Sequence, residues 1–127
     1  MTPSVIISVF LNGEIHKISL VKTGSTSLSA EHKVWKIGSN ANGPADSDDT
    51  YALTQCVASA DGKVLAGQGP FWSKVKVTFT ETPAGVDSAD LNVSAMIMSS
   101  DQSGRISPSD CASGIAFVKQ CNFPLAA

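Results

Sequence analysis

Charged and aromatic residues are scarce in this chain of 127 residues. Only 16% of the residues are charged and 6% are aromatic, and nine Lys and Arg oppose eleven Asp and Glu. So few charges exclude a disordered tail or a coiled coil. The net charge of −2 also excludes a protein that coats nucleic acid by bulk charge alone. Ser, Thr, Val, Ala and Gly are prominent instead, which favours short strands and turns over long helices.

Long apolar runs and paired cysteines are also missing. No apolar stretch approaches the roughly 20 residues that a membrane span requires, and the apolar N-terminal run lacks the flanks of a signal peptide. The cysteines Cys56, Cys111 and Cys121 form no Cys-x-x-Cys pair, so neither a zinc site nor a thioredoxin-like motif is signalled. We expect them to pack in the core of a soluble protein that folds in a reducing compartment, while bridges between subunits stay open.

Catalytic and metal-binding motifs are absent as well. The sequence has no Gly-x-Ser-x-Gly elbow, no His-Glu-x-x-His pair and no phosphate-binding glycine loop. Its histidines, His16 and His32, fall on strand positions where we expect exposed side chains. The acidic stretch 46–49 lacks the spacing and the glycine of an EF-hand loop, and we interpret it as a solvated loop. We therefore predict no enzyme, no metal and no cofactor; an enzyme would need a concave pocket around one histidine.

Strand signals run through most of the chain. Two β-rich runs, 4–11 and 14–22, flank Asn12-Gly13, a pair typical of a tight hairpin turn, and we expect a bulge near 16–18. Further strands are predicted at 31–38, 51–59, 72–81 and 90–98. The segments between them are polar or rich in glycine and are interpreted as loops at 23–29, 39–50, 60–71 and 82–89.

Only the C-terminal part of the sequence has a helical pattern. Ser107 and Pro108 suit the N-cap and the first helical position, and Asp110 follows the cap by three residues, as in a capping box. Apolar residues then recur at helical spacing until Pro124 ends the segment. We predict a single α+β domain over residues 1–127, an antiparallel β-sheet with an N-terminal hairpin and a C-terminal helix packed on one face.

Residues 73–81 (SKVKVTFTE) alternate between the two faces of a strand. Val75 and Val77 suit the core, which leaves Lys74, Lys76 and Thr78 on the other face. A sheet covered by a helix on one side meets water or a partner on the other. Lysines and small polar side chains suit phosphates and base edges, although a solvated sheet face is the plainer alternative.

Several segments together resemble one protein family. They are YALTQCVAS (51–59) and SKVKVTFTETP (73–83), which resemble two central strands, and DLNVSAMI (90–97) followed by SDCASGIAFVK (109–119). The last two resemble a final strand with a Leu-Asn pair that runs into a helix opening with Ser-Asp-Cys. With the N-terminal hairpin and the element order, this resembles the coat proteins of single-stranded RNA bacteriophages, the levivirus group.

The resemblance implies an obligate homodimer in which two sheets join edge to edge and the helices reach over the partner. Dimers would assemble into a small icosahedral shell around a single-stranded RNA genome, in a virion built in the bacterial cytoplasm. The inner sheet face would bind RNA through Lys74, Lys76, Thr78, Asn92, Ser94 and Thr54. A register slip of one residue would turn Thr54 to the other face. The loop 82–89 falls where the family adjusts between symmetry environments.

The chain departs from the family at three places. One helix is predicted where the better-known members have two, and the connection 60–71 is longer and richer in glycine. Asp90 stands where an aromatic would precede Asn92 by two residues, so we expect general RNA packaging instead of recognition of a familiar operator hairpin. The alternative function is a small β-rich binding module that recognises carbohydrate or protein through the loops 39–50 and 60–71.

Overall fold

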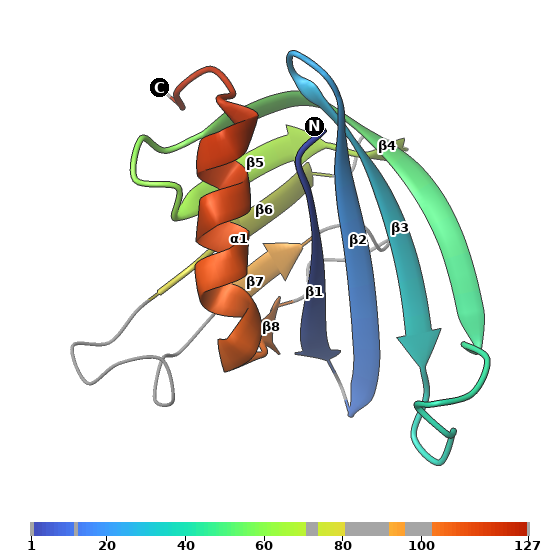
Figure 1. The fold of residues 1–127 in the computed structure, drawn as a ribbon. Helices are drawn as coiled ribbons and strands as arrows, with labels where there is room; N and C mark the ends of the chain where they lie inside the picture. Colours follow the sequence, from blue (N-terminus) through green and yellow to red (C-terminus); the bar gives the residue numbers. More distant parts are fainter. Residues whose placement is uncertain (1, 12, 71–73, 81–91, 96–102, 127) are drawn as a thin grey trace.

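The structure is a computed structural model that describes residues 2–11, 13–70, 74–80, 92–95 and 103–126 (Figure 1). Its elements are β1 Ser4–Leu11, β2 Glu14–Gly24, β3 Ser27–Trp35, β4 Ser47–Ala58, β5 Val64–Gln68, β6 Lys74–Thr78, β7 Asn92–Ala95, β8 Ser103–Ile106 and α1 Pro108–Cys121. Each strand pairs antiparallel with the next one along the chain. The predicted antiparallel sheet, N-terminal hairpin and C-terminal helix are confirmed.

The sheet closes on itself, whereas the resemblance implied an edge at which a partner's sheet would join. β8 returns to β1 through the pairs Val9↔Ile106 and Phe10↔Arg105. Gly104 permits this approach, because a Cβ there would lie 2.5 Å from the Leu11 side chain. Strand twist accumulated over many strands curls a sheet, and closure removes its edges. Extension of the sheet across a dimer concerns a second chain and stays a prediction.

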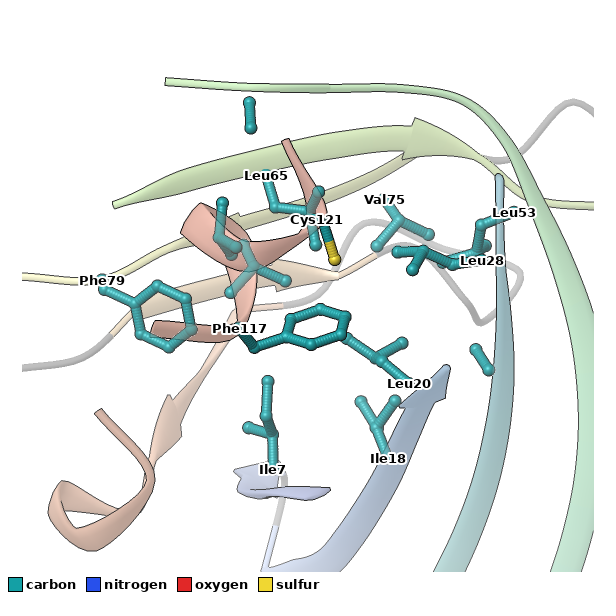
Figure 2. Close-up of a cluster of buried hydrophobic side chains, with 14 of the residues drawn as sticks. Ile7, Ile18, Leu20, Leu28, Leu53, Leu65, Val75, Phe79, Phe117 and Cys121 are labelled. Carbon is teal, nitrogen blue, oxygen red and sulfur yellow. The ribbon is translucent and has the colours of Figure 1, made fainter. Parts of the chain in front are cut away.

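Helix α1 lies along the concave side of the curled sheet (Figure 1). It buries Cys111, Gly114, Ile115, Phe117, Val118 and Cys121. Figure 2 shows Phe117 in the middle of the core, with Ile7 and Leu20 on one side and Leu65 and Val75 on the other. The predicted apolar stripe is confirmed, as is core packing of the cysteines, since Cys56, Cys111 and Cys121 are all buried and form no disulfide.

Gly114 is needed where the helix meets the end of β6. A Cβ at this position would lie 2.3 Å from Cζ of Phe79, whose side chain is 2% exposed. Carbon atoms do not approach that closely, so the absence of a side chain sets the distance between helix and sheet. By intrinsic helix propensity alone, a glycine inside a helix counts only as a weak point.

The start of α1 is held differently from the prediction. Ser107 is the N-cap residue but makes no side-chain capping bond, so the predicted capping box is wrong. The carboxylate of Asp110 instead accepts a 2.6 Å hydrogen bond from the backbone N–H of Ser8 in β1. At the other end, Lys22 Nζ donates to the Cys121 carbonyl at 2.8 Å, where a helix leaves carbonyls unpaired. Both helix ends are therefore tied to the hairpin.

Four predictions about strands and loops need correction. The segment 23–29 is not a loop, because β2 and β3 continue through it around a turn at 25–26. The bulge lies between Lys22 and Gly24, and the β1–β2 register runs without a shift through 16–18. The predicted loop 39–50 ends earlier, because β4 begins at Ser47. Strands β5 and β8 were missed because both are short and contain glycine, and their pairing on both sides supplies what intrinsic propensity does not.

Some predictions fall outside the described residues: the turn residue Asn12, the loop 82–89 and Asp90. Within the described part of the chain, no helix has the length and apolar character needed to cross a membrane.

Candidate functional site

The strand β6 places its lysines on the outer face of the sheet. Lys74 and Lys76 are exposed and Thr78 is half-buried. The residues between them, Val75 and Val77, are 5% and 6% exposed and belong to the core. The alternation predicted for this strand is confirmed, and the lysines lie on the face opposite the core residues Val75 and Val77.

The sheet register brings the predicted site residues onto neighbouring strands. Lys76 pairs with Ser94, and Thr78 pairs with Asn92, in the ladder between β6 and β7. On the other side, Lys74 pairs with Gln68 in β5, and Gln68 pairs with Thr54 in β4. All six predicted residues therefore lie within four adjacent strands.

The position of Thr54 answers the question of register in β4. Leu53 is 2% exposed and belongs to the core, whereas Thr54 is exposed. Just beyond, the ladder with β5 shifts between Thr54 and Val57, and Gln55 has a φ of 54°. Such a bulge lets two successive residues face the same side. The bulge explains why Gln55 is exposed next to Thr54. Thr54 itself lies on the outer face, as predicted, because its neighbour Leu53 points into the core.

The charges on the outer face are segregated by strand. Among the described residues of β5 to β8, the charged ones are Lys74, Lys76 and Arg105, all of them basic. Arg105 pairs with Asn92, which continues the row of Thr78 towards β8. We name Thr54, Gln68, Lys74, Lys76, Thr78 and Arg105 the basic face, with Asn92 and Ser94 next to it in the strand register. A protein of net charge −2 thus concentrates cations on one part of its sheet.

Strands β3 and β4 carry charges of both signs instead. Lys33 pairs with Asp48 in the ladder, and its Nζ lies 3.9 Å from Oε1 of Glu31. Such exposed pairs contribute little to stability, about 0–1 kcal/mol. Their opposite signs cancel at short range, so this part of the sheet offers a polyanion less attraction than the basic face does.

Gln68 and Arg105 were missed by sequence reasoning. Gln68 lies in β5, a segment interpreted as a connection, and Arg105 lies in β8, which was not predicted at all. Only the strand register reveals that these residues border the predicted ones.

The histidines contradict the prediction of exposed side chains. His16 is 1% exposed and His32 is 5% exposed, because both point into the curled sheet. His16 Nδ1 lies 2.7 Å from His32 Nε2, so each ring satisfies one nitrogen of the other in the core. Burial lowers the pKa of both rings below the ordinary 6.5, and for His32 the neighbouring ring adds to the effect.

Hydrogen bonds within the protein organise the acidic stretch and its loop. The carboxylate of Asp46 accepts from Ser39 Oγ at 2.6 Å and from Lys36 N–H at 2.8 Å, and the Ser39 bond is the main reason for its lowered pKa. Trp35 Nε1 donates to the Gly43 carbonyl at 3.1 Å, which fastens the same loop. Among the residues that the structure describes, no group of three or more His, Cys, Asp and Glu could hold a metal ion.

An apolar cavity of about 20 Å³ lies inside the sheet. It is lined by side chains of the core, Ile7, Leu28, Cys56 and Leu65 among them, and neither histidine takes part. This volume holds about one water, which would find no polar partner there. The cavity therefore offers no room for a substrate.

No protein-family model, no curated protein and no solved structure matches this chain.

Proposed function

We propose that this chain is a structural coat subunit of the single-stranded RNA bacteriophage type, which dimerises, assembles into a small icosahedral shell and packages RNA against its basic face. The observation that carries the proposal is the strand register. It gathers Thr54, Lys74, Lys76, Thr78, Asn92 and Ser94 on four adjacent strands.

The composition of the basic face suits the backbone of a nucleic acid. Successive residues on one side of a strand are about 7 Å apart, so Lys74 and Lys76 present two cations in a row. Hydroxyl and amide groups beside them can donate to phosphate oxygens and base edges. With three basic residues per subunit, the packaging affinity should fall with salt at a log–log slope of about −2, from roughly −0.7 per phosphate neutralised on a single strand.

The outer face of the N-terminal hairpin supports self-association. Ile6 is 61% exposed, Phe10 54% and Val21 40%. Ile6 pairs with Ser19 and Val21 pairs with Ser4, so Ile6 and Val21 are diagonal neighbours across the β1–β2 ladder. Exposed apolar side chains that gather in this way are typical of protein–protein contacts.

The seam between β8 and β1 is where a partner's sheet would join. Among the described residues it consists of two residue pairs, whereas the β1–β2 ladder has eight. A short ladder is the least costly one to exchange for pairing with a second chain, and this exchange would give the continuous sheet that the proposed dimer requires.

The test begins with the chain expressed alone in bacteria. Size-exclusion chromatography with absorbance at 260 and 280 nm, and electron microscopy of the void peak, detect shells and their RNA. Uniform spheres with nuclease-resistant absorbance at 260 nm are expected. A small species without particles at any salt concentration would contradict the coat proposal and favour the binding module.

A charge-reversal pair then tests the basic face. Lys74→Glu with Lys76→Glu should leave folded dimers whose particles are depleted of RNA. The control is Lys17→Glu with Lys33→Glu, which changes the net charge equally at directly paired positions on β2 and β3. Normal RNA content in the first variant, or equal depletion in both, would refute the assigned face.

A further inference from the structure

His16 and His32 lie on neighbouring strands, β2 and β3, with their rings enclosed by the sheet. The rings stack with centroids 5.0 Å apart and planes inclined by 17°. The 2.7 Å contact between Nδ1 of His16 and Nε2 of His32 requires a proton on one nitrogen and a lone pair on the other. The hydrogen bond therefore exists only while at least one of the two rings is neutral.

Glu14 sets the direction of this hydrogen bond. Oε1 of Glu14 lies 3.6 Å from His16 Nε2, and that nitrogen has no hydrogen-bond partner among the described residues. A lone pair at Nε2 would face the carboxylate, whereas an N–H there is attracted to it. His16 thus carries its proton on Nε2 and accepts at Nδ1, and His32 donates from Nε2.

We propose that His16 and His32 form an acid-sensitive latch that joins β2 to β3 inside the closed sheet and opens when both rings are protonated. A second proton turns both facing nitrogens into donors and leaves two cations 2.7 Å apart in the core. Neither the hydrogen bond nor the stacked arrangement survives that change, so this end of the sheet must separate or unfold. The latch belongs to a single chain and is independent of the proposed packaging of RNA.

The other groups around the pair determine how many protons it accepts. Glu14 of β2 and Asp49, the register partner of His32 on β4, attract positive charge. Tyr51, farther along β4, has a pKa raised mainly by burial and stays neutral throughout the relevant range. The residues paired with His16 are apolar, Val9 on β1 and Val34 on β3. The two carboxylates can balance the first proton, but burial and the neighbouring ring oppose the second.

The sign of the pH dependence follows from the lowered pKa values. At pH 7.5 and above both rings are largely neutral in the folded and the unfolded chain, and pH has little effect through them. Below it, the unfolded histidines take up protons that the folded ones resist, so folding weakens as the pH falls. With two such groups, the folding equilibrium constant drops by up to about a hundredfold between pH 7.5 and 5.5. Asp46 and Asp61 have lowered pKa values and titrate below this window.

The test uses hydrogen–deuterium exchange at the imidazole C2 position, read by mass spectrometry, on the full chain in whatever assembly it forms. Both pKa values should lie below 6.5, with slow exchange for buried rings. In His16→Gln, the pKa of His32 should rise. The folding equilibrium constant of this variant should fall only about tenfold between pH 7.5 and 5.5, because one histidine remains. In Glu14→Gln, the pKa of His16 should fall further.

Two results would overturn the latch. One is a pKa at or above 6.5 for both rings in the unmodified chain, which needs no variant to fold. The other is a urea midpoint that stays constant between pH 7.5 and 5.5.

Discussion

Replacing Gly114 by alanine tests how closely the helix packs on the sheet. The added methyl group would lie 2.3 Å from Cζ and 2.5 Å from Cε1 of Phe79. The ring is buried at 2% exposure, and Gly114 itself is buried on the face that α1 turns to the core. Either the ring or the helix must therefore move.

Two opposing effects determine how much Gly114→Ala changes the free energy of unfolding. Alanine in place of glycine favours a helix interior by about 1 kcal/mol. Overpacking a filled core costs about 1–3 kcal/mol, and here the methyl meets an aromatic ring that has little free space. We expect Gly114→Ala to destabilise the protein by about 1 kcal/mol on balance. In a Phe79→Leu background, Gly114→Ala should stabilise the protein instead, because leucine lacks the ring atoms that the methyl group would meet.

The assay is urea unfolding followed by circular dichroism for the four corners of this double-mutant cycle. The coupling free energy between the positions should be about 2 kcal/mol, well above the scatter of about 0.5 kcal/mol for independent sites. Ser113→Ala, an exposed position on the same helix, controls for helix propensity. If Gly114→Ala stabilises both backgrounds equally, the ring does not limit the approach of the helix and the reasoning is refuted.

Two more predictions concern the helix start and the thiols. Asp110→Ala should lower the free energy of unfolding in urea by about 1–3 kcal/mol, because it leaves the Ser8 N–H without its 2.6 Å acceptor. The control Asp48→Ala, on the exposed part of β4, should change this free energy by no more than about 0.5 kcal/mol. Equal effects of the two variants would exclude the role of Asp110 in holding the helix start. Burial, with a smaller effect of Cys121, raises the pKa of the Cys56 thiol to about 11. Roughly one in a thousand Cys56 thiols is then ionised at pH 8. Peptide mapping after treatment with a thiol reagent should show Cys56 modified at least about a hundredfold faster in urea than in the folded chain. Comparable rates would show that Cys56 is accessible in the folded chain.

Strands with clean alternation were predictable because their pattern depends on neighbours two residues apart. The two faces of β6 follow from this rule, whereas the β-rich runs on either side of Asn12-Gly13 predicted the hairpin of β1 and β2, and Ser107-Pro108 marked the helix start. β5 and β8 escaped prediction because glycine interrupts their pattern, and their partners lie elsewhere in the sequence.

The basic face was predictable in part. Lys74, Lys76 and Thr78 share one strand, so their common side follows from sequence alone. Gln68 and Arg105 joined them only through pairing across strands, which no local pattern encodes. Thr54 depended on a register that the core position of Leu53 settles.

The sequence by itself determined the N-terminal hairpin, the two faces of β6 and the C-terminal helix, since turn pairs and periodicity act over a few residues. Only the tertiary structure decided what lies inside. His16 and His32 looked like exposed polar residues until the curl of the sheet brought one nitrogen within 2.7 Å of the other. Asp110 had the sequence position of a capping residue, but its carboxylate accepts a hydrogen bond from the backbone N–H of Ser8 in β1. A polar side chain can be buried when a partner satisfies it, and that partner is chosen by the fold and not by neighbours in the chain.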